Sequence, residues 1–151
     1  MDGGIILSVL MAISGPELEC LAKNIYFESR NQSHLGQLAV GQVTLNRVDD
    51  PRYPNTICEV VKQGHQNADG SMVRHRCQFS WYCDGLPDTP LNEEMWIQSY
   101  QMAYESAEYF YQGIDLTNGS THYHTTNVNP HWAPSLTKTM RVDDHIFYRW
   151  D

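Results

Sequence analysis

The strongest constraint on the fold lies in residues 20–47, where apolar side chains recur at helical spacing on both sides of a polar break at residues 31–33. This pattern predicts two helices. In the first, Leu21 and Ile25 define the inward face, and Glu28 falls on that face because it follows Leu21 by seven residues. A carboxyl group in an apolar setting loses hydration, which raises its pKa. The sequence therefore predicts that Glu28 can hold a proton near neutral pH, as a general acid must.

Glu28 also has a second interpretation that helical geometry leaves open. Buried charges in proteins are usually paired with an opposite charge. Arg30, Arg47 or another cation could supply that partner for the Glu28 carboxylate. In that case the residue would be structural rather than catalytic.

The remaining patterns predict a fold of the α+β class. Apolar periodicity and capping residues indicate helices over residues 14–30, 34–47, 56–63 and 92–112. Gly36 and Gly41, inside the second helix, are expected to permit close packing. Runs of β-forming residues indicate strands over 120–125, 138–142 and 146–150. Residues 64–76 are polar and rich in turn formers, which predicts a mobile loop beside a groove.

Length and charge narrow the classes of protein. The 151 residues suit one catalytic domain over residues 1–151, with residues 1–15 as an N-terminal extension. The apolar run at residues 5–13 is too short to span a bilayer and lacks the positive residues of a secretory signal, so we expect a packed helix over residues 1–13 and no stable membrane insertion. The formal charge of −8 argues against nucleic acid as a partner. We expect a monomer.

The four cysteines, Cys20, Cys58, Cys77 and Cys83, allow two disulfides in three connectivities. They contain no Cys-x-x-Cys pair, so a zinc ribbon or a thioredoxin-like site is not indicated. We expect the pairs Cys20–Cys83 and Cys58–Cys77, which implies work outside the reducing cytosol. The alternative is four buried free thiols.

Several motifs resemble the SleB/CwlJ-type cell-wall hydrolase family, whose members include spore cortex-lytic enzymes. The resemblance covers residues 18–149, nearly the whole chain. Two departures are Ser29, where the family usually has Ala, and Asp143, where it often has Gly. The motifs are Tyr-Phe-Glu-Ser-Arg at 26–30, Gly-Gln-Leu-Ala-Val at 36–40, Leu-Asn-Arg-Val at 45–48, Cys-Gln-Phe-Ser-Trp-Tyr-Cys-Asp-Gly at 77–85, Gly-Ser-Thr-His-Tyr-His at 119–124, Val-Asn-Pro-His-Trp-Ala at 128–133 and His-Ile-Phe-Tyr at 145–148.

This resemblance implies a lysozyme-like helical domain with a small antiparallel sheet formed mainly by the C-terminal third. It implies that Glu28 is the catalytic acid/base, that no cofactor or metal is needed, and that the partner is the glycan strand of peptidoglycan. Because the catalytic domain stands without a wall-binding repeat or a clear signal peptide, we expect a phage endolysin. It would act in the periplasm or cell wall after synthesis in the host cytoplasm and release by a holin.

The residues expected to bind substrate lie in two of these motifs. A sugar site needs hydrogen-bonding groups and flat aromatic faces, which Gln78, Ser80 and Trp81 offer, whereas Phe79 is expected in the core. On a strand, Thr121 and Tyr123 share one face while His122 and His124 share the other. Thr121 and Tyr123 could therefore hold substrate beside Glu28, and His124 is included as a further contact.

The opposite face of this strand leaves a zinc site open as an alternative. His122 and His124, with His131 or His145, could bind the metal of an amidase or peptidase. A non-catalytic wall-binding module is a further alternative, since it would keep the aromatic residues without needing Glu28.

The expected reaction is cleavage of the bond between N-acetylmuramic acid and N-acetylglucosamine. Ordinary glycosidases pair the acid with a second carboxylate. Asp84 is the nearest candidate, but Asp-Gly at 84–85 could equally be a turn. A single carboxylate suits a lytic transglycosylase, and a hydrolysing muramidase is the alternative.

Overall fold

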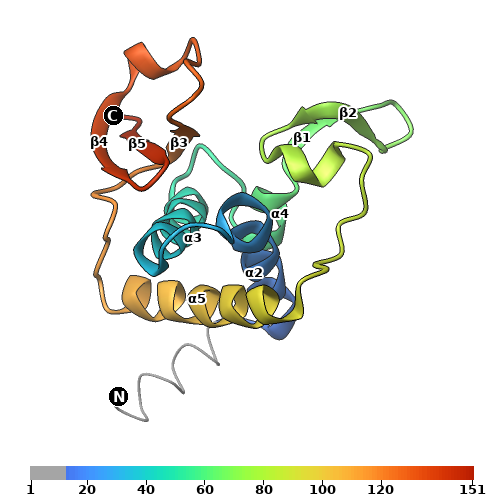
Figure 1. The fold of residues 1–151 in the computed structure, drawn as a ribbon. Coiled ribbons are helices and arrows are strands. Elements are labelled where there is room, and N and C mark those ends of the chain that lie inside the picture. Colours follow the sequence, from blue (N-terminus) through green and yellow to red (C-terminus); the bar gives the residue numbers. More distant parts are fainter. Residues whose placement is uncertain (1–12) are drawn as a thin grey trace.

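The structure, a computed structural model, describes residues 13–151 as a helical body carrying two β-structures (Figure 1). The predicted helix over residues 1–13 lies outside the described residues except for Ile13, which is buried. The elements in chain order are α2 (Gly15–Ser29), α3 (His34–Asp49), α4 (Ile57–Val61), β1 (Gly64–Gln66), β2 (Met72–Cys77), the 3-10 helix η1 (Ser80–Cys83), α5 (Glu93–Tyr111), β3 (His122–Thr125), the 3-10 helix η2 (Ala133–Ser135), β4 (Thr137–Val142) and β5 (His145–Arg149).

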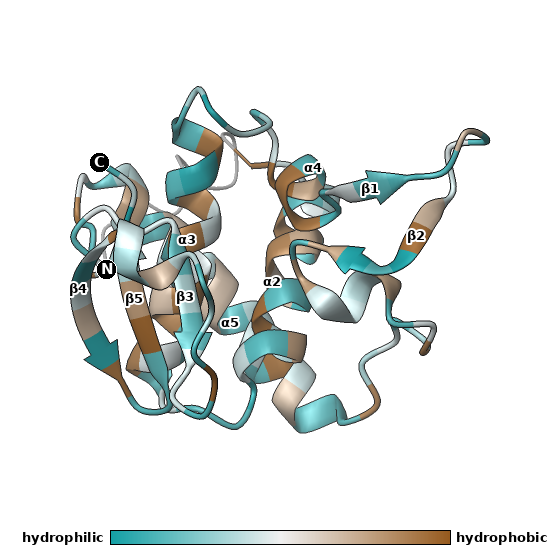
Figure 2. Cartoon of the chain, turned by 90° about the horizontal axis from the view of Figure 1, so that it is seen from above, coloured by the Kyte–Doolittle hydropathy of each residue, from teal (hydrophilic) through white to brown (hydrophobic). Residues whose placement is uncertain are grey.

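The helices form the core because their apolar faces meet. Helix α2 packs against α3, α4 and α5, and α3 packs against α4 and α5. Figure 2 shows the hydrophobic colouring gathered on α2 and α3 between the two β-structures. All four predicted helices are confirmed, within two residues at each end. The helical side chains at the centre of the core are Leu21, Ala22, Ile25, Val40, Val43, Val60, Ala103 and Ala107.

The predicted C-terminal sheet is also confirmed. Strands β3, β5 and β4 form an antiparallel sheet in that order, with β5 in the middle. Tyr123 of β3 pairs with Phe147 of β5, whose side chain is fully buried against the helices. The chain is therefore of the α+β class, as predicted.

The loop predicted over residues 64–76 is wrong, because this segment forms a two-stranded antiparallel hairpin, β1–β2. Gly64 pairs with Cys77 and Gln66 pairs with Met72, with an irregularity between the two pairs. The segment is mostly exposed and polar, so its sequence carries no strand-like alternation. Backbone pairing rather than burial defines these strands.

The predicted disulfide pairing is wrong as well. The pairs are Cys20–Cys58, which joins α2 to α4, and Cys77–Cys83, which joins the end of β2 to the end of η1. The described residues include no free cysteine, so the free-thiol alternative also fails. Each pair links elements that already lie side by side, which spacing in the sequence does not reveal.

The expected role of the α3 glycines is supported by the packing. A β-carbon at Gly41 would lie 2.5 Å from Ser106 Oγ on α5, and one at Gly36 would lie 2.7 Å from Asp143 Oδ2. The close approach of α5 therefore favours glycine at position 41, whereas a β-carbon at position 36 would displace the Asp143 carboxylate of the β4–β5 turn. In residues 13–151, the helices are all too short or too polar to cross a membrane.

Candidate active site

Glu28 lies on the last turn of α2, next to the two β-structures. Leu21 and Ile25 precede it on the inward face and are fully buried, while the Glu28 side chain is only partly buried. Burial raises the pKa of the Glu28 carboxyl above its ordinary value, and a hydrogen bond from Tyr123 and the charge of Arg47 offset part of that rise. A raised pKa is the direction of shift that favours a general acid.

Tyr123 fixes one oxygen of that carboxyl. Its hydroxyl donates to Glu28 Oε1 at 2.5 Å, across 95 residues of sequence. Burial and the neighbouring Glu28 raise the pKa of Tyr123 well above its ordinary value, so the phenol keeps its proton and acts as a donor. Because Oε1 is held by Tyr123, Oε2 is the oxygen left for proton exchange.

Arg47 lies nearby but forms no ion pair with Glu28. Within residues 13–151, the ion pairs closer than 4.0 Å are Arg52–Asp50 and Arg149–Asp151. Arg47 instead donates from Nε to the carbonyl oxygen of Thr121 at 2.7 Å. The direct ion pair considered as an alternative for Glu28 is therefore not formed.

The Arg47 guanidinium is held in place by aromatic rings. It lies 5.1 Å from the ring centres of both Tyr53 and Phe79. Its Nη1 is buried without a hydrogen-bond partner among the described residues. The side chain thus supplies positive charge near Glu28 without closing off the carboxyl.

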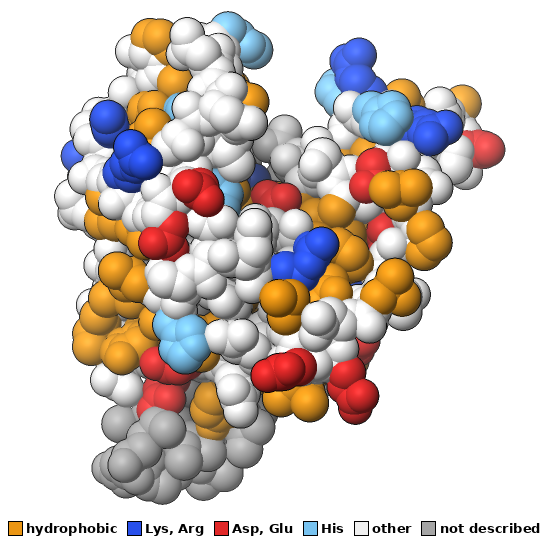
Figure 3. Space-filling view, viewed as in Figure 1, with side chains coloured by type: hydrophobic (Ala, Val, Ile, Leu, Met, Phe, Trp, Pro, Cys, Tyr) orange, Lys and Arg blue, Asp and Glu red, His pale blue; other side chains and the backbone are white. Residues whose placement is uncertain are grey.

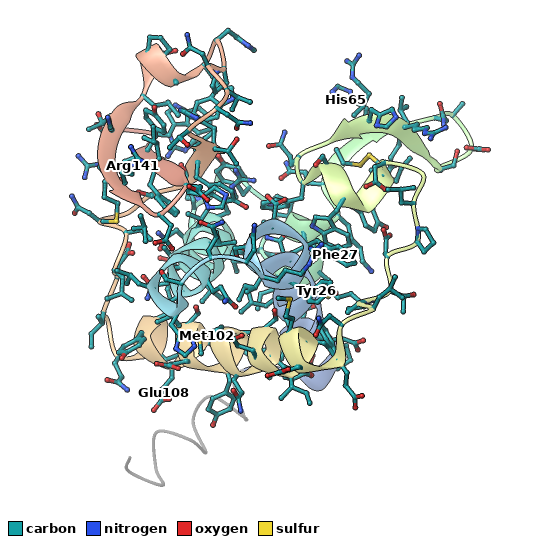
Figure 4. The ribbon with its side chains drawn as sticks, viewed as in Figure 1. Tyr26, Phe27, His65, Met102, Glu108 and Arg141 are labelled. Atoms are coloured by element: carbon teal, nitrogen blue, oxygen red, sulfur yellow. A yellow bond between two sulfur atoms is a disulfide. The ribbon has the colours of Figure 1, made fainter. Side chains whose placement is uncertain are left out.

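Glu28 lies between two lobes, which we call the sheet lobe (β3–β5 and η2) and the hairpin lobe (β1, β2 and η1). Its own carboxyl contacts Tyr123 in the sheet lobe. The preceding residue, Phe27, stacks on Trp81 of η1 with ring centres 4.8 Å apart (Figure 4). Figure 3 shows that the surface is hollowed between these two lobes. The end of α2 therefore forms the floor of a cleft.

Trp81 supports this floor rather than lining it. Its side chain is 8% exposed, and its indole N–H donates to Asn24 Oδ1 at 2.9 Å. Asn24 in turn donates to Thr44 Oγ1 at 3.2 Å. This buried polar network joins η1, α2 and α3, and it could not be predicted because Asn24 lies outside the family motifs. The expected aromatic platform at Trp81 is thus covered by Phe27.

The other expected contact residues differ in their exposure. Gln78 and Ser80 are exposed, and their side chains form no hydrogen bond within the described residues. Thr121 is 4% exposed, and its hydroxyl contacts His122 Nδ1 at 2.9 Å. His124 contacts Tyr148 through Nε2 at 2.8 Å, and the two rings are stacked. Gln78 and Ser80 therefore remain available for substrate, whereas Thr121 is buried.

The histidines do not form the arrangement that a zinc site needs. In the described part of the chain, no three His, Cys, Asp or Glu side chains are grouped so that they could hold a metal ion. Burial, followed by the charges of Arg47 and Arg52, lowers the pKa of His122 to about 4. His145 is buried against the ring of Tyr123, with ring centres 5.1 Å apart. His122 packs instead against Trp132 and Trp150, and His124 packs against Trp132 and Tyr148.

Asp84 does not supply an obvious second carboxylate. Its Oδ1 accepts a hydrogen bond from the backbone N–H of Leu86 at 2.9 Å, and Gly85 has a positive φ of 83°. The Asp-Gly pair therefore forms a turn, as the alternative interpretation held.

A sequence profile described as Cell Wall Hydrolase matches residues 31–148. The chain belongs to this family. The matched range begins three residues after Glu28, so the assignment of Glu28 depends on the geometry above rather than on the profile. The Tyr123, Arg47 and His145 positions all lie inside the matched range.

Solved structures and curated relatives agree with this cell wall hydrolase fold. The catalytic domain of the Bacillus cereus SleB protein superposes with a TM-score of 0.66 at 24% identity, covering 90% of this chain and 91% of that one. The catalytic domain of the germination-specific lytic transglycosylase SleB from Bacillus anthracis gives 0.64 at 25% identity, covering 91% and 97%. The spore cortex-lytic enzyme of Bacillus subtilis is 24% identical over 136 residues.

The chain spans only part of its curated relatives. The match covers 89% of this chain but 38% of the Bacillus subtilis enzyme, and 35% of the spore cortex-lytic enzyme of Halalkalibacterium halodurans, which is 23% identical over 135 residues. The matched region is thus only a part of these longer proteins.

Proposed function

We propose that this cell wall hydrolase is a lytic transglycosylase that cleaves peptidoglycan between N-acetylmuramic acid and N-acetylglucosamine. One observation carries the proposal: a single partly buried carboxyl, Glu28, lies on the floor of a cleft with a raised pKa and no ion-pair partner. The SleB catalytic domain of Bacillus anthracis, named a lytic transglycosylase, supports the same reaction class.

In the first step, Glu28 donates its proton to the glycosidic oxygen. The bond between that oxygen and C1 of the muramic sugar breaks, and both electrons leave with the oxygen of the N-acetylglucosamine. Positive charge develops at C1 and its ring oxygen, beside the newly formed Glu28 carboxylate. The hydrogen bond from Tyr123 to Oε1 orients the carboxyl, so that Oε2 makes the proton transfer.

In the second step, the Glu28 carboxylate removes the proton from the 6-hydroxyl of the muramic sugar. The 6-oxygen then bonds to C1 and closes a 1,6-anhydro ring. The proton returns to Glu28, no water is consumed, and no second carboxylate is needed. The exposed Gln78 and Ser80 side chains are the groups we propose to hydrogen-bond the glycan from the hairpin lobe.

Mass spectrometry of fragments released from purified peptidoglycan in ¹⁸O-labelled water tests the proposal. A transglycosylase yields anhydro-muramic ends without the label, whereas a hydrolysing muramidase yields reducing ends that carry it. Glu28→Gln should abolish release, while Glu19→Gln, an exposed carboxyl on the same helix, should not change it. Full release by Glu28→Gln would refute the proposal, and loss of release in a chelator would favour the zinc amidase.

Action on the cell wall follows from this proposal. Release through a phage holin and the monomeric state stay predictions.

A further inference from the structure

The segment Lys62 to Arg76, which we call the hairpin arm, has a charge opposite to that of the rest of the chain. It holds three of the ten Lys and Arg residues, two of the seven histidines and only one of the eighteen acidic residues. Figure 3 shows blue and pale-blue side chains gathered at the top of the hairpin lobe. A local basic surface on a chain of charge −8 indicates an anionic ligand at this place.

The backbone of the arm gathers these cations at an irregular point of the hairpin. Between the pairs Gly64–Cys77 and Gln66–Met72, the single residue His65 faces four residues of β2, which include Arg74, His75 and Arg76. His75 has a positive φ of 64°, a backbone conformation that residues other than glycine seldom adopt. Bulges of this kind redirect side chains and are frequent beside functional sites.

Most of these side chains have no polar partner among the described residues. Those of Lys62, His65, His75 and Arg76 are exposed and form no hydrogen bond or ion pair with the described residues. Arg74 differs, because its Nε donates to the carbonyl oxygen of Asp84 at 3.3 Å. The arm therefore offers two cations, Lys62 and Arg76, and two imidazole rings, His65 and His75, to an outside ligand.

The arm is attached directly to the wall of the cleft. The disulfide Cys77–Cys83 joins its base to η1, and Trp81 of η1 stacks on Phe27 beside Glu28. Figure 4 shows His65 on the hairpin, on the side that borders the space between the two lobes. A polymeric ligand lying in the cleft could thus extend onto the hairpin arm.

We propose that the hairpin arm binds the carboxylate groups of the peptide stems of peptidoglycan. This inference depends on the proposed function, because it takes the glycan strand to lie in the cleft. Peptide stems project from the muramic sugars and carry free carboxylates, so a strand over Glu28 would bring them alongside the arm. Exposed charge pairs are individually weak and screened by salt, so the arm contributes through several contacts at once.

A binding experiment separates the arm from the chemistry. Full-length protein carrying Glu28→Gln is sedimented with insoluble peptidoglycan freed of teichoic acid, in the native form and after conversion of its carboxylates to amides. The double change Lys62→Gln and Arg76→Gln should weaken binding to native peptidoglycan about 3–10-fold at low salt. Lys138→Gln, an exposed cation on β4 of the sheet lobe, should bind like the parent.

Amidation should weaken the parent by a similar factor and leave the arm variant unchanged. Equal binding of the parent and the arm variant to native peptidoglycan would refute carboxylate binding by the hairpin arm but not the proposed function. An equal effect of amidation on the two proteins would have the same meaning. A requirement for teichoic acid would overturn the choice of ligand. A parent that binds neither form would overturn the proposed function together with this inference.

Discussion

Replacing Glu28 by Gln separates a catalytic carboxyl from a structural one, because the two cases predict opposite effects on stability. Glutamine keeps the shape of the side chain and the oxygen that accepts from Tyr123 at 2.5 Å. It cannot transfer a proton, so the rate of peptidoglycan cleavage should fall about 10²–10⁴-fold. The informative measurement is the free energy of unfolding of the same variant.

The sign of the stability change follows from the raised pKa of Glu28. Burial disfavours the charged form in the folded state, so the folded protein holds this proton more tightly than the unfolded chain does. The contribution of Glu28 to stability is therefore greatest below the unfolded value of about 4.3, and it is lost as pH rises through the folded pKa. Each unit by which the pKa is raised corresponds to about 1.4 kcal/mol.

Glutamine does not titrate, so Glu28→Gln should be more stable than the wild type at pH 7, by about 1.4 kcal/mol for each unit by which the pKa is raised, and equal to it near pH 4. Had Glu28 been one half of a buried ion pair, its removal would cost about 3–5 kcal/mol. Urea denaturation of both proteins at the two pH values, followed by tryptophan fluorescence, distinguishes these outcomes. A variant destabilised by several kcal/mol at pH 7 would refute the reasoning.

Three further changes test the surroundings of the site. Tyr123→Phe removes the hydrogen bond that lowers the pKa of the Glu28 carboxyl, so the alkaline limb of the pH–rate profile should move to higher pH and the maximal rate should fall about 3–10-fold; an unchanged profile would contradict this. Asn24→Ala leaves the indole N–H of Trp81 unpaired and should cost about 2–4 kcal/mol in urea denaturation, so a loss below about 1 kcal/mol would count against the network. Gly41→Ala places a β-carbon 2.5 Å from Ser106 Oγ and should lower the melting temperature, whereas helix propensity alone predicts an increase.

The helical body could be predicted because burial and period coincide there. Helices α2 and α5 each present one apolar stripe to the core, with caps at Ser14 and Asn92 whose side chains accept from the backbone as expected. The C-terminal sheet was predictable for the same reason, since β-forming residues recur in short runs that are partly buried. Apolar periodicity predicts a helix or strand correctly where one face of that element is buried.

The hairpin and the disulfides show where patterning fails. Strand β2 has no buried residue, so its sequence lacks the apolar alternation that would have predicted a strand. The disulfide Cys77–Cys83 closes a short turn between β2 and η1, and this turn is defined by the hairpin that was not foreseen. Connectivity of four cysteines depends on which elements pack together, and composition does not contain that information.

The candidate site was predicted unevenly for a related reason. Glu28 was singled out because a charge on an apolar face is a local anomaly. Tyr123 was singled out because strand alternation placed it with Thr121, but its expected role was to hold substrate rather than to donate to Glu28. The burial of Trp81 could not be predicted, since a tryptophan suits both a sugar platform and a core. Burial of Trp81 depends on Asn24, which is distant in sequence and accepts the indole N–H at 2.9 Å.

Asp143 shows how a departure from the family pattern is accommodated beside the site. It replaces a frequent glycine at a positive φ of 50°, which costs a non-glycine residue about 1–2 kcal/mol. Its carboxylate, however, accepts from the backbone N–H of Ser33 at 2.9 Å and from the Ser33 hydroxyl at 2.5 Å. These hydrogen bonds lower the pKa of Asp143, so the carboxylate stays charged at neutral pH and its contribution is lost only as pH falls through the lowered value.

The contact joins the β4–β5 turn to the start of α3, five residues after Glu28. Charge-assisted hydrogen bonds contribute about 1.5–3 kcal/mol each when shielded and less when exposed, as here, so the two bonds to Ser33 oppose the cost of the backbone strain. Glycine at this turn would relax the backbone but leave the sheet lobe without this anchor. Strand β3, which contains Tyr123, pairs with β5. Asp143 at the β4–β5 turn therefore helps to set the position of the Tyr123 hydroxyl that orients the Glu28 carboxyl.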